Sequence, residues 1–86
     1  MMIVAKIGKT GFIFKSDENG NRIGNSQNIS VEYKYYSGGT HLHVENSAKS
    51  NGIKTGDYVY YSDDDVEGRS KVYHVDSLGK DYFSVK

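Results

Sequence analysis

The sequence contains no cysteine, no proline and no tryptophan among its 86 residues. Without cysteine, the chain has no disulfide, no thiolate metal ligand and no cysteine nucleophile. Small secreted domains often depend on disulfides, so this composition favours a reducing compartment, and we expect a cytoplasmic protein. The apolar start of the chain is interrupted at Lys6 and has no charged region before it, which is not typical of a signal peptide. No apolar run approaches the roughly 20 residues that span a bilayer, and we expect no contact with a membrane.

The chain also lacks an excess of charge of either sign. Eleven basic residues balance eleven acidic residues, so the formal net charge is zero. Nucleic-acid-binding modules usually carry a basic excess, because neutralising phosphates supplies much of their affinity. The balance therefore disfavours nucleic acid as a partner, although a local basic patch remains an alternative. Such a patch would consist of Lys6, Lys9, Lys15, Arg22 and Lys34.

What the chain does contain is a clear alternation of apolar and polar residues between Ile29 and Tyr36. Alternate side chains of a strand point to opposite faces, so this run predicts a strand with one buried and one solvated face. The alternation places Tyr33 and Tyr35 on the buried face. After a Gly-Gly turn the same pattern resumes from Thr40 to Glu45, and two such runs joined by glycines predict a β-hairpin.

The remainder of the chain repeats this pattern of short strands and turns, and no segment has the period of a helix. Gly8 to Gly11 is predicted as a turn, and Ile23 as the buried anchor of an extended connection. About seven short antiparallel strands in a single domain, residues 1–86, predict an all-β barrel or sandwich, SH3-like or OB-like. Closure hides strand edges and therefore favours a barrel. The other expected strands are residues 2–7, 12–15, 58–61, 71–76 and 81–85. The predicted core comprises Val31, Tyr33, Leu42, Val44, Val59, Val72 or Tyr73, and Phe83.

The C-terminal part of the chain contains a Gly-Asp-Tyr-Val sequence at residues 56–59, followed by an acidic loop and by Tyr73-His74-Val75. This arrangement resembles the Gly-Asp-x-Val strand entry of small SH3-like barrels, such as those of phage head–tail joining proteins. The resemblance covers about a third of the chain. It implies a small barrel of that type and suggests a phage protein.

Two groups of residues have the chemistry of metal ligands. His41, His43 and Glu45 lie on one face of one predicted strand, and His74 is a distant third imidazole. The acidic run from Asp63 to Glu67 offers oxygen ligands, but it lacks the spacing of a calcium loop. Solvated side chains on a hairpin and on a loop explain both groups, so we expect no metal and no cofactor. A metal-dependent enzyme using His41, His43 and His74 is kept as a second alternative.

Tyrosine is abundant, with eight residues in the chain, and it is enriched at binding surfaces. No catalytic constellation is recognisable, so we expect a non-enzymatic protein-binding module. Its composition is typical of phage or mobile-element accessory proteins, either virion components or inhibitors of a host enzyme, and a symmetric dimer is a further expectation. A nucleic-acid-binding barrel is the first alternative. The predicted contact surface comprises Tyr36, Tyr58, Tyr60, Asp63, Asp64, Asp65 and Glu67.

Overall fold

The computed structural model describes residues 9–36, 39–44, 52–64 and 68–86, and all regular structure in these ranges is β-strand. The expected strand at residues 2–7 lies outside the described residues. None of the described residues belongs to a helix with the length and hydrophobicity that crossing a membrane requires. The strands are β1 (Lys9–Ser16), β2 (Ile29–Tyr36), β3 (Gly39–Val44), β4 (Tyr58–Ser62), β5 (Lys71–Leu78) and β6 (Tyr82–Val85).

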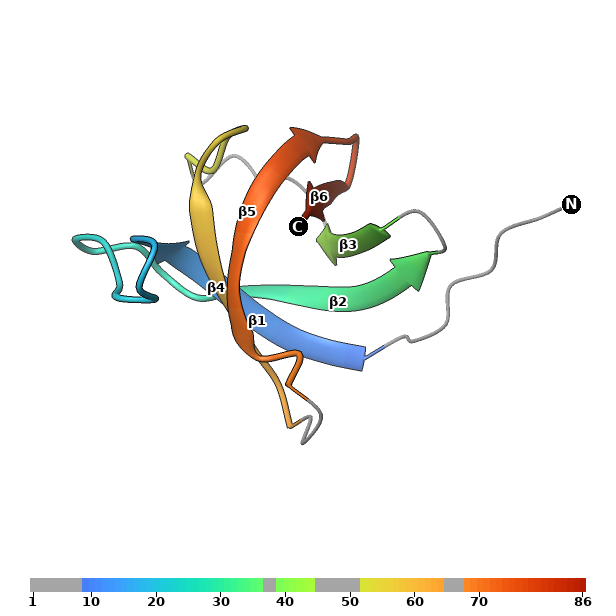
Figure 1. Ribbon diagram of the computed structural model, residues 1–86, viewed down its shortest axis with the longest axis horizontal. Coiled ribbons are helices and arrows are strands. Elements are labelled where there is room, and N and C mark those ends of the chain that lie inside the picture. The colour runs from blue at the N-terminus through green and yellow to red at the C-terminus, as the bar shows by residue number, and fades with distance from the viewer. Residues whose placement is uncertain (1–8, 37–38, 45–51, 65–67) are drawn as a thin grey trace, which may run out of the picture.

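The six strands form a closed antiparallel barrel in the order β1-β2-β3-β6-β5-β4 (Figure 1). The predicted hairpin is confirmed, because β2 and β3 pair directly, with Tyr33 opposite Leu42. Closure comes from β1, which pairs with β2 on one side and with β4 on the other. Of the two predicted architectures, a barrel or a sandwich, the structure therefore has the barrel.

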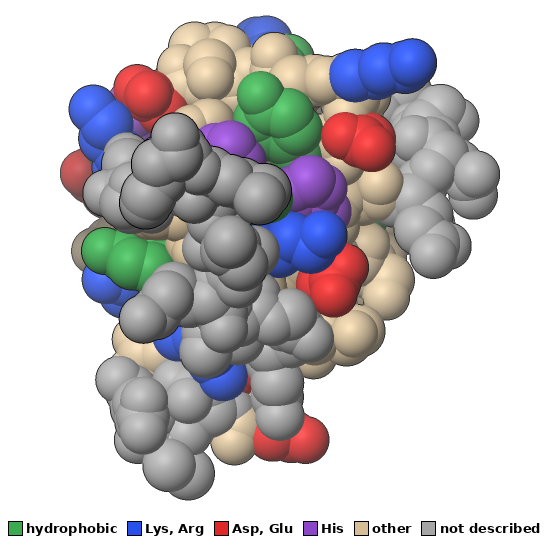
Figure 2. Space-filling model, turned by 90° about the vertical axis from the view of Figure 1, so that its right-hand side faces the viewer, with side chains coloured by type: hydrophobic (Ala, Val, Ile, Leu, Met, Phe, Trp, Pro, Cys, Tyr) green, Lys and Arg blue, Asp and Glu red, His purple; other side chains and the backbone are tan. Residues whose placement is uncertain are grey.

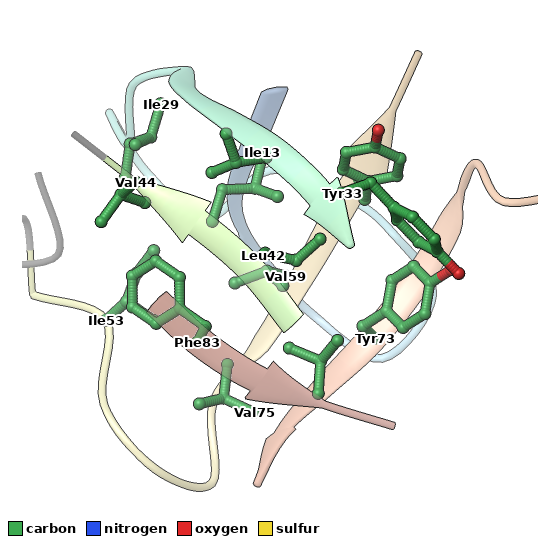
Figure 3. Packing of buried hydrophobic residues seen from close by; sticks show 13 residues of the cluster. Ile13, Ile29, Tyr33, Leu42, Val44, Ile53, Val59, Tyr73, Val75 and Phe83 are labelled. Atoms are coloured by element: carbon green, nitrogen blue, oxygen red, sulfur yellow. The ribbon is translucent and has the colours of Figure 1, made fainter. Parts of the chain in front are cut away.

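The barrel interior is filled by the inward-facing residues of all six strands, together with Ile53 (Figure 3). In Figure 3, Tyr33 and Tyr73 lie at one end of the core, and Ile29, Val44 and Ile53 lie at the other. Every position of the predicted core is buried, with Tyr73 rather than Val72 as the inward residue of its pair. The alternation in the sequence therefore identified the core-facing side of strands β2 to β6.

Strand β1 differs from the prediction, because it begins at Lys9 and runs through the expected turn. Gly11 lies inside this strand, opposite Val31 of β2. A Cβ atom at Gly11 would come within 2.8 Å of the Tyr61 ring and would also collide with the carbonyl oxygen of Ser62. Glycine here therefore allows β1 and β4 to approach closely beneath a large ring, a use that differs from turn formation.

Two apolar residues predicted to be buried are exposed. Tyr35 is 44% exposed and lies one residue before the end of β2, opposite Thr40 of β3. Ile23 is 49% exposed in the connection between β1 and β2. The strand expected at residues 71–76 is also longer than predicted, because β5 continues to Leu78 after an irregularity between Val75 and Ser77.

One end of the barrel interior contains buried tyrosine hydroxyls. The Tyr61 hydroxyl donates a 2.6 Å hydrogen bond to the Asp63 carboxylate, and the Tyr73 hydroxyl donates to the carbonyl oxygen of Arg69 at 3.0 Å. The Tyr33 hydroxyl lies 3.5 Å from the Thr40 hydroxyl. Burial, followed by the hydrogen bond to Asp63, raises the pKa of Tyr61 above the ordinary tyrosine value, and burial, followed by the neighbouring Tyr33 side chain, raises the pKa of Tyr73.

This end of the barrel predicts a loss of stability at alkaline pH. The unfolded chain ionises its tyrosines near pH 10, whereas folded Tyr61 and Tyr73 stay neutral beyond it. Their contribution is therefore complete below about pH 10 and is lost as the pH rises above that value. Urea unfolding followed by circular dichroism at increasing pH should show the free energy of unfolding falling above pH 10. Tyr73→Phe should weaken this dependence and Tyr35→Phe should leave it unchanged, whereas a flat wild-type profile would contradict the expectation.

Candidate functional site

The outer face of β2, β3 and β6 carries a cluster of four rings, which we call the aromatic face: Tyr36, His41, His43 and Tyr82. These residues point away from the core because their sequence neighbours Leu42, Val44 and Phe83 point into it. The strand register places His43 directly between Glu32 of β2 and Tyr82 of β6.

The rings of the aromatic face contact one another across three strands. His41 is stacked on Tyr82, with ring centroids 4.4 Å apart and planes 10° from parallel. The ring centroid of Tyr36 lies 4.8 Å from that of His41, and the ring centroid of His43 lies 5.4 Å from that of Tyr82. Such ring pairs add about 0.5–1.5 kcal/mol beyond the area they bury. The cluster is therefore an ordered surface and not four independent side chains.

Polar groups surround these rings. Lys34 lies opposite His41 in the register and is 3.8 Å from the carboxylate of Glu32. Burial lowers the pKa of His43 below its ordinary value, and the nearby Lys34 charge lowers it further. Among the described residues, the buried Nε2 atom of His43 has no hydrogen-bond partner. Figure 2 shows histidine side chains beside hydrophobic, basic and acidic side chains on one side of the molecule. At neutral pH, His43 therefore contributes an uncharged ring.

Gly79 holds Tyr82 in position. Its backbone N–H donates to the carbonyl oxygen of Tyr82 at 2.9 Å in the turn between β5 and β6. A Cβ atom on Gly79 would collide with the Tyr82 ring. The Tyr82 ring, which stacks on His41, therefore occupies space that only a residue without a side chain leaves open.

The predicted tyrosines of the contact surface lie on two sides of the barrel. Tyr36 belongs to the aromatic face, whereas Tyr58 and Tyr60 point outwards from β4, as predicted, and are half-buried. The ring centroids of Tyr58 and His74 are 5.1 Å apart, and those of Tyr60 and Phe14 are 5.5 Å apart. The structure thus separates Tyr36 from the other two tyrosines.

Tyr60 packs under the connection between β1 and β2. A Cβ atom on Gly20 of this connection would lie 3.2 Å from Val72 and 3.4 Å from the Tyr60 ring. The guanidinium of Arg22 lies 3.9 Å above the Phe14 ring, a cation–π contact. Tyr60 therefore has partners within its own chain and contributes to a small second layer of packing outside the barrel.

The predicted acidic contact residues also differ from one another. Asp63 has a fully buried side chain that accepts from Tyr61 and lies 3.5 Å from the Nε atom of Arg69, so its carboxylate is not available at the surface. Asp64 is exposed. Asp65 and Glu67 lie outside the described residues.

The three histidines of the metal alternative do not converge. His41 and His43 lie on β3 with ring centroids 6.1 Å apart, whereas His74 lies on β5 beside Tyr58. Strand β6 separates β3 from β5 in the barrel. Glu45 lies outside the described residues. Within the described ranges, no three His, Asp or Glu side chains are grouped to hold a metal ion.

Sequence reasoning missed Tyr82 as a site residue, although the alternation of β6 contained the signal. Phe83 and Val85 are the buried residues of that strand, which leaves Tyr82 on the outer face. The stacking of Tyr82 on His41 could not be predicted, because it depends on β6 pairing with β3. Comparison of the chain with protein-family models, curated proteins and solved structures finds no match.

Proposed function

We propose that this protein is a non-enzymatic protein-binding module that contacts its partner through the aromatic face. The observation that carries the proposal is the cluster of contacting rings on the outside of a barrel whose core is complete without them. Tyrosine is prominent among the residues that contribute most to the affinity of interfaces. A preorganised surface of this kind loses little side-chain freedom when a partner binds.

The proposal includes the class of partner suggested by the composition and by the resemblance to phage head–tail joining proteins. The partner is then a host protein or a virion protein, met in the cytoplasm, and the chain acts as a virion component or as an inhibitor of a host enzyme. Self-association into a dimer through the same face is a further form of this function.

The aromatic face is tested by replacing Tyr36 and Tyr82 together with serine. Both rings lie on the outer face, so the variant should keep the barrel. Its affinity for the partner should fall by about 2–4 kcal/mol, the range of interface hot spots. The partner is first captured from host lysate on the immobilised protein, and its dissociation constant is then measured by calorimetry for both proteins.

Tyr35→Ser is the matched control, because it removes an exposed tyrosine that does not belong to the aromatic face. Sedimentation at several concentrations measures self-association of the same three proteins. A folded Tyr36→Ser, Tyr82→Ser variant that binds and self-associates like wild type would overturn the proposal. Binding of oligothymidylate that depends on these two rings would instead support the nucleic-acid alternative.

A further inference from the structure

A concave surface lies between the turn after β1 and the start of β4, on strands other than those of the aromatic face. It is an open groove of about 420 Å³. The residues that line it are Lys15, Ser16, Asp17, Glu18, Ile23, Gly56, Asp57 and Tyr58. Its volume is sufficient for one long side chain of another molecule, since ligand pockets begin at about 300 Å³.

The groove has ordered walls. The Asp17 carboxylate accepts from the backbone N–H groups of Asn19 and Asn21 at 2.8 and 2.9 Å, which fixes the turn on one side. On the other side, the Asp57 carboxylate accepts from the backbone N–H of Lys54 at 2.9 Å. Lys15 connects the two walls, because its ammonium lies 3.7 Å from Asp57. The groove is therefore built before any ligand arrives.

Ile23 combines a hydrogen-bonded backbone with an exposed apolar side chain in this lining. Its backbone N–H donates to the carbonyl oxygen of Lys15 at 3.1 Å, and its own carbonyl oxygen accepts from Ser26 at 3.1 Å. The backbone is thus held at both groups while about half of the side chain stays in water. With the ring of Tyr58, Ile23 gives the groove an apolar part.

The charge of the lining is negative. Asp17, Glu18 and Asp57 supply three carboxylates against the single ammonium of Lys15, which already pairs with Asp57. Backbone hydrogen bonds, first of all from Asn21, lower the pKa of Asp17, so its carboxylate is ionised at neutral pH. An apolar surface beside an excess of carboxylates complements a side chain with an aliphatic stem and a cationic head.

We propose that this groove binds an arginine or lysine side chain of a partner protein, with the stem against Ile23 and Tyr58 and the cation beside Asp17 and Glu18. The inference rests on the proposed protein-binding function and names the chemistry of one contact. The groove and the aromatic face are on different strands, so an experiment can contradict one of the two proposals without contradicting the other.

The test uses the full chain and short capped peptides in which glycines flank one Arg, one Lys, one Gln or one Glu. Amide shifts of the ¹⁵N-labelled protein are followed during titration at low ionic strength. The Arg and Lys peptides should give saturable shifts at Glu18, Ile23 and Tyr58, and added salt should weaken them. Glu18→Gln should raise the dissociation constant about threefold to fivefold, the range expected for an exposed ion pair. Ile23→Ser should also raise it.

Asp64→Asn is the matched control, since it removes an exposed carboxylate beyond the opposite end of β4 and should leave the dissociation constant unchanged. The Tyr36→Ser, Tyr82→Ser variant should bind the peptides like wild type, which separates this inference from the aromatic face. Absence of saturable shifts with the Arg and Lys peptides would overturn the inference. Equal binding of the Gln peptide, or equal effects of Glu18→Gln and Asp64→Asn, would overturn it as well.

Discussion

Replacing Val31 by aspartate is expected to remove a large part of the free energy of unfolding of the protein. Val31 is 3% exposed and lies opposite Val44 in the β2–β3 pair, inside the closed barrel. A carboxylate there has apolar neighbours and should cost at least about 3–5 kcal/mol. A chain of this length is stable by only about 4–13 kcal/mol. Urea unfolding followed by circular dichroism should therefore show a much lower midpoint, or no folded baseline.

Ser30→Asp provides the control, because Ser30 is the preceding residue of the same strand and its side chain is exposed. It introduces the same group with nearly the same sequence context, and its effect should stay within about 0.5 kcal/mol. Similar midpoints for the two variants would show that the faces of β2 are assigned incorrectly.

The second large effect is expected at Asp63. Its buried carboxylate accepts from the Tyr61 hydroxyl at 2.6 Å and pairs with Arg69, whose side chain is 18% exposed. Asp63→Ala removes the acceptor and leaves a buried phenol and a largely buried guanidinium without this carboxylate. The expected loss is about 3–5 kcal/mol of the free energy of unfolding, the range for breaking a buried ion pair.

A double-mutant cycle with Tyr61→Phe measures how much of this loss comes from the hydroxyl. The phenylalanine keeps the ring over Gly11 and removes only the donor, so it should cost about 1–3 kcal/mol. The two losses should not add, because both variants break the same hydrogen bond. Asp64→Ala is the control at the neighbouring exposed position. Strict additivity, or equal effects at Asp63 and Asp64, would contradict the buried arrangement.

The core could be predicted because the side chains of a strand alternate between its two faces, so apolar residues at every second position identify the buried face. Val31, Leu42 and Val59 are identified by that period alone, whichever strands they pair with. Local turn propensity was less reliable. Gly11 has the composition of a turn, but glycine is also required where a strand passes beneath a large ring, and only the pairing of β1 with β4 distinguishes the two uses.

The candidate site was less predictable for the same reason. Tyr36 and Tyr60 both face outwards, as the alternation indicates. What lies over each ring depends on contacts made across the barrel: Tyr60 meets the turn at Gly20, and Tyr36 meets His41. Asp63 belongs to an acidic run that is typical of a solvated loop, and its burial follows from the position of Tyr61 inside the barrel. The exposure of Ile23 has no signal in the sequence that we can identify.

The way in which the barrel closes has a consequence for its synthesis on the ribosome. Strands β1 and β3 acquire their outer neighbours only from β4 and β6, as the pairs Phe12 with Ser62 and Thr40 with Val85 show. These neighbours are translated roughly half a chain later. A nascent chain that ends after β3 therefore has two strands with unsatisfied backbone edges, the kind of surface on which strands of other chains can add. Because two of the six strand pairs of the barrel are of this distant kind, we expect folding on the millisecond-to-second scale of all-β domains, and completion only after β6 has left the ribosome.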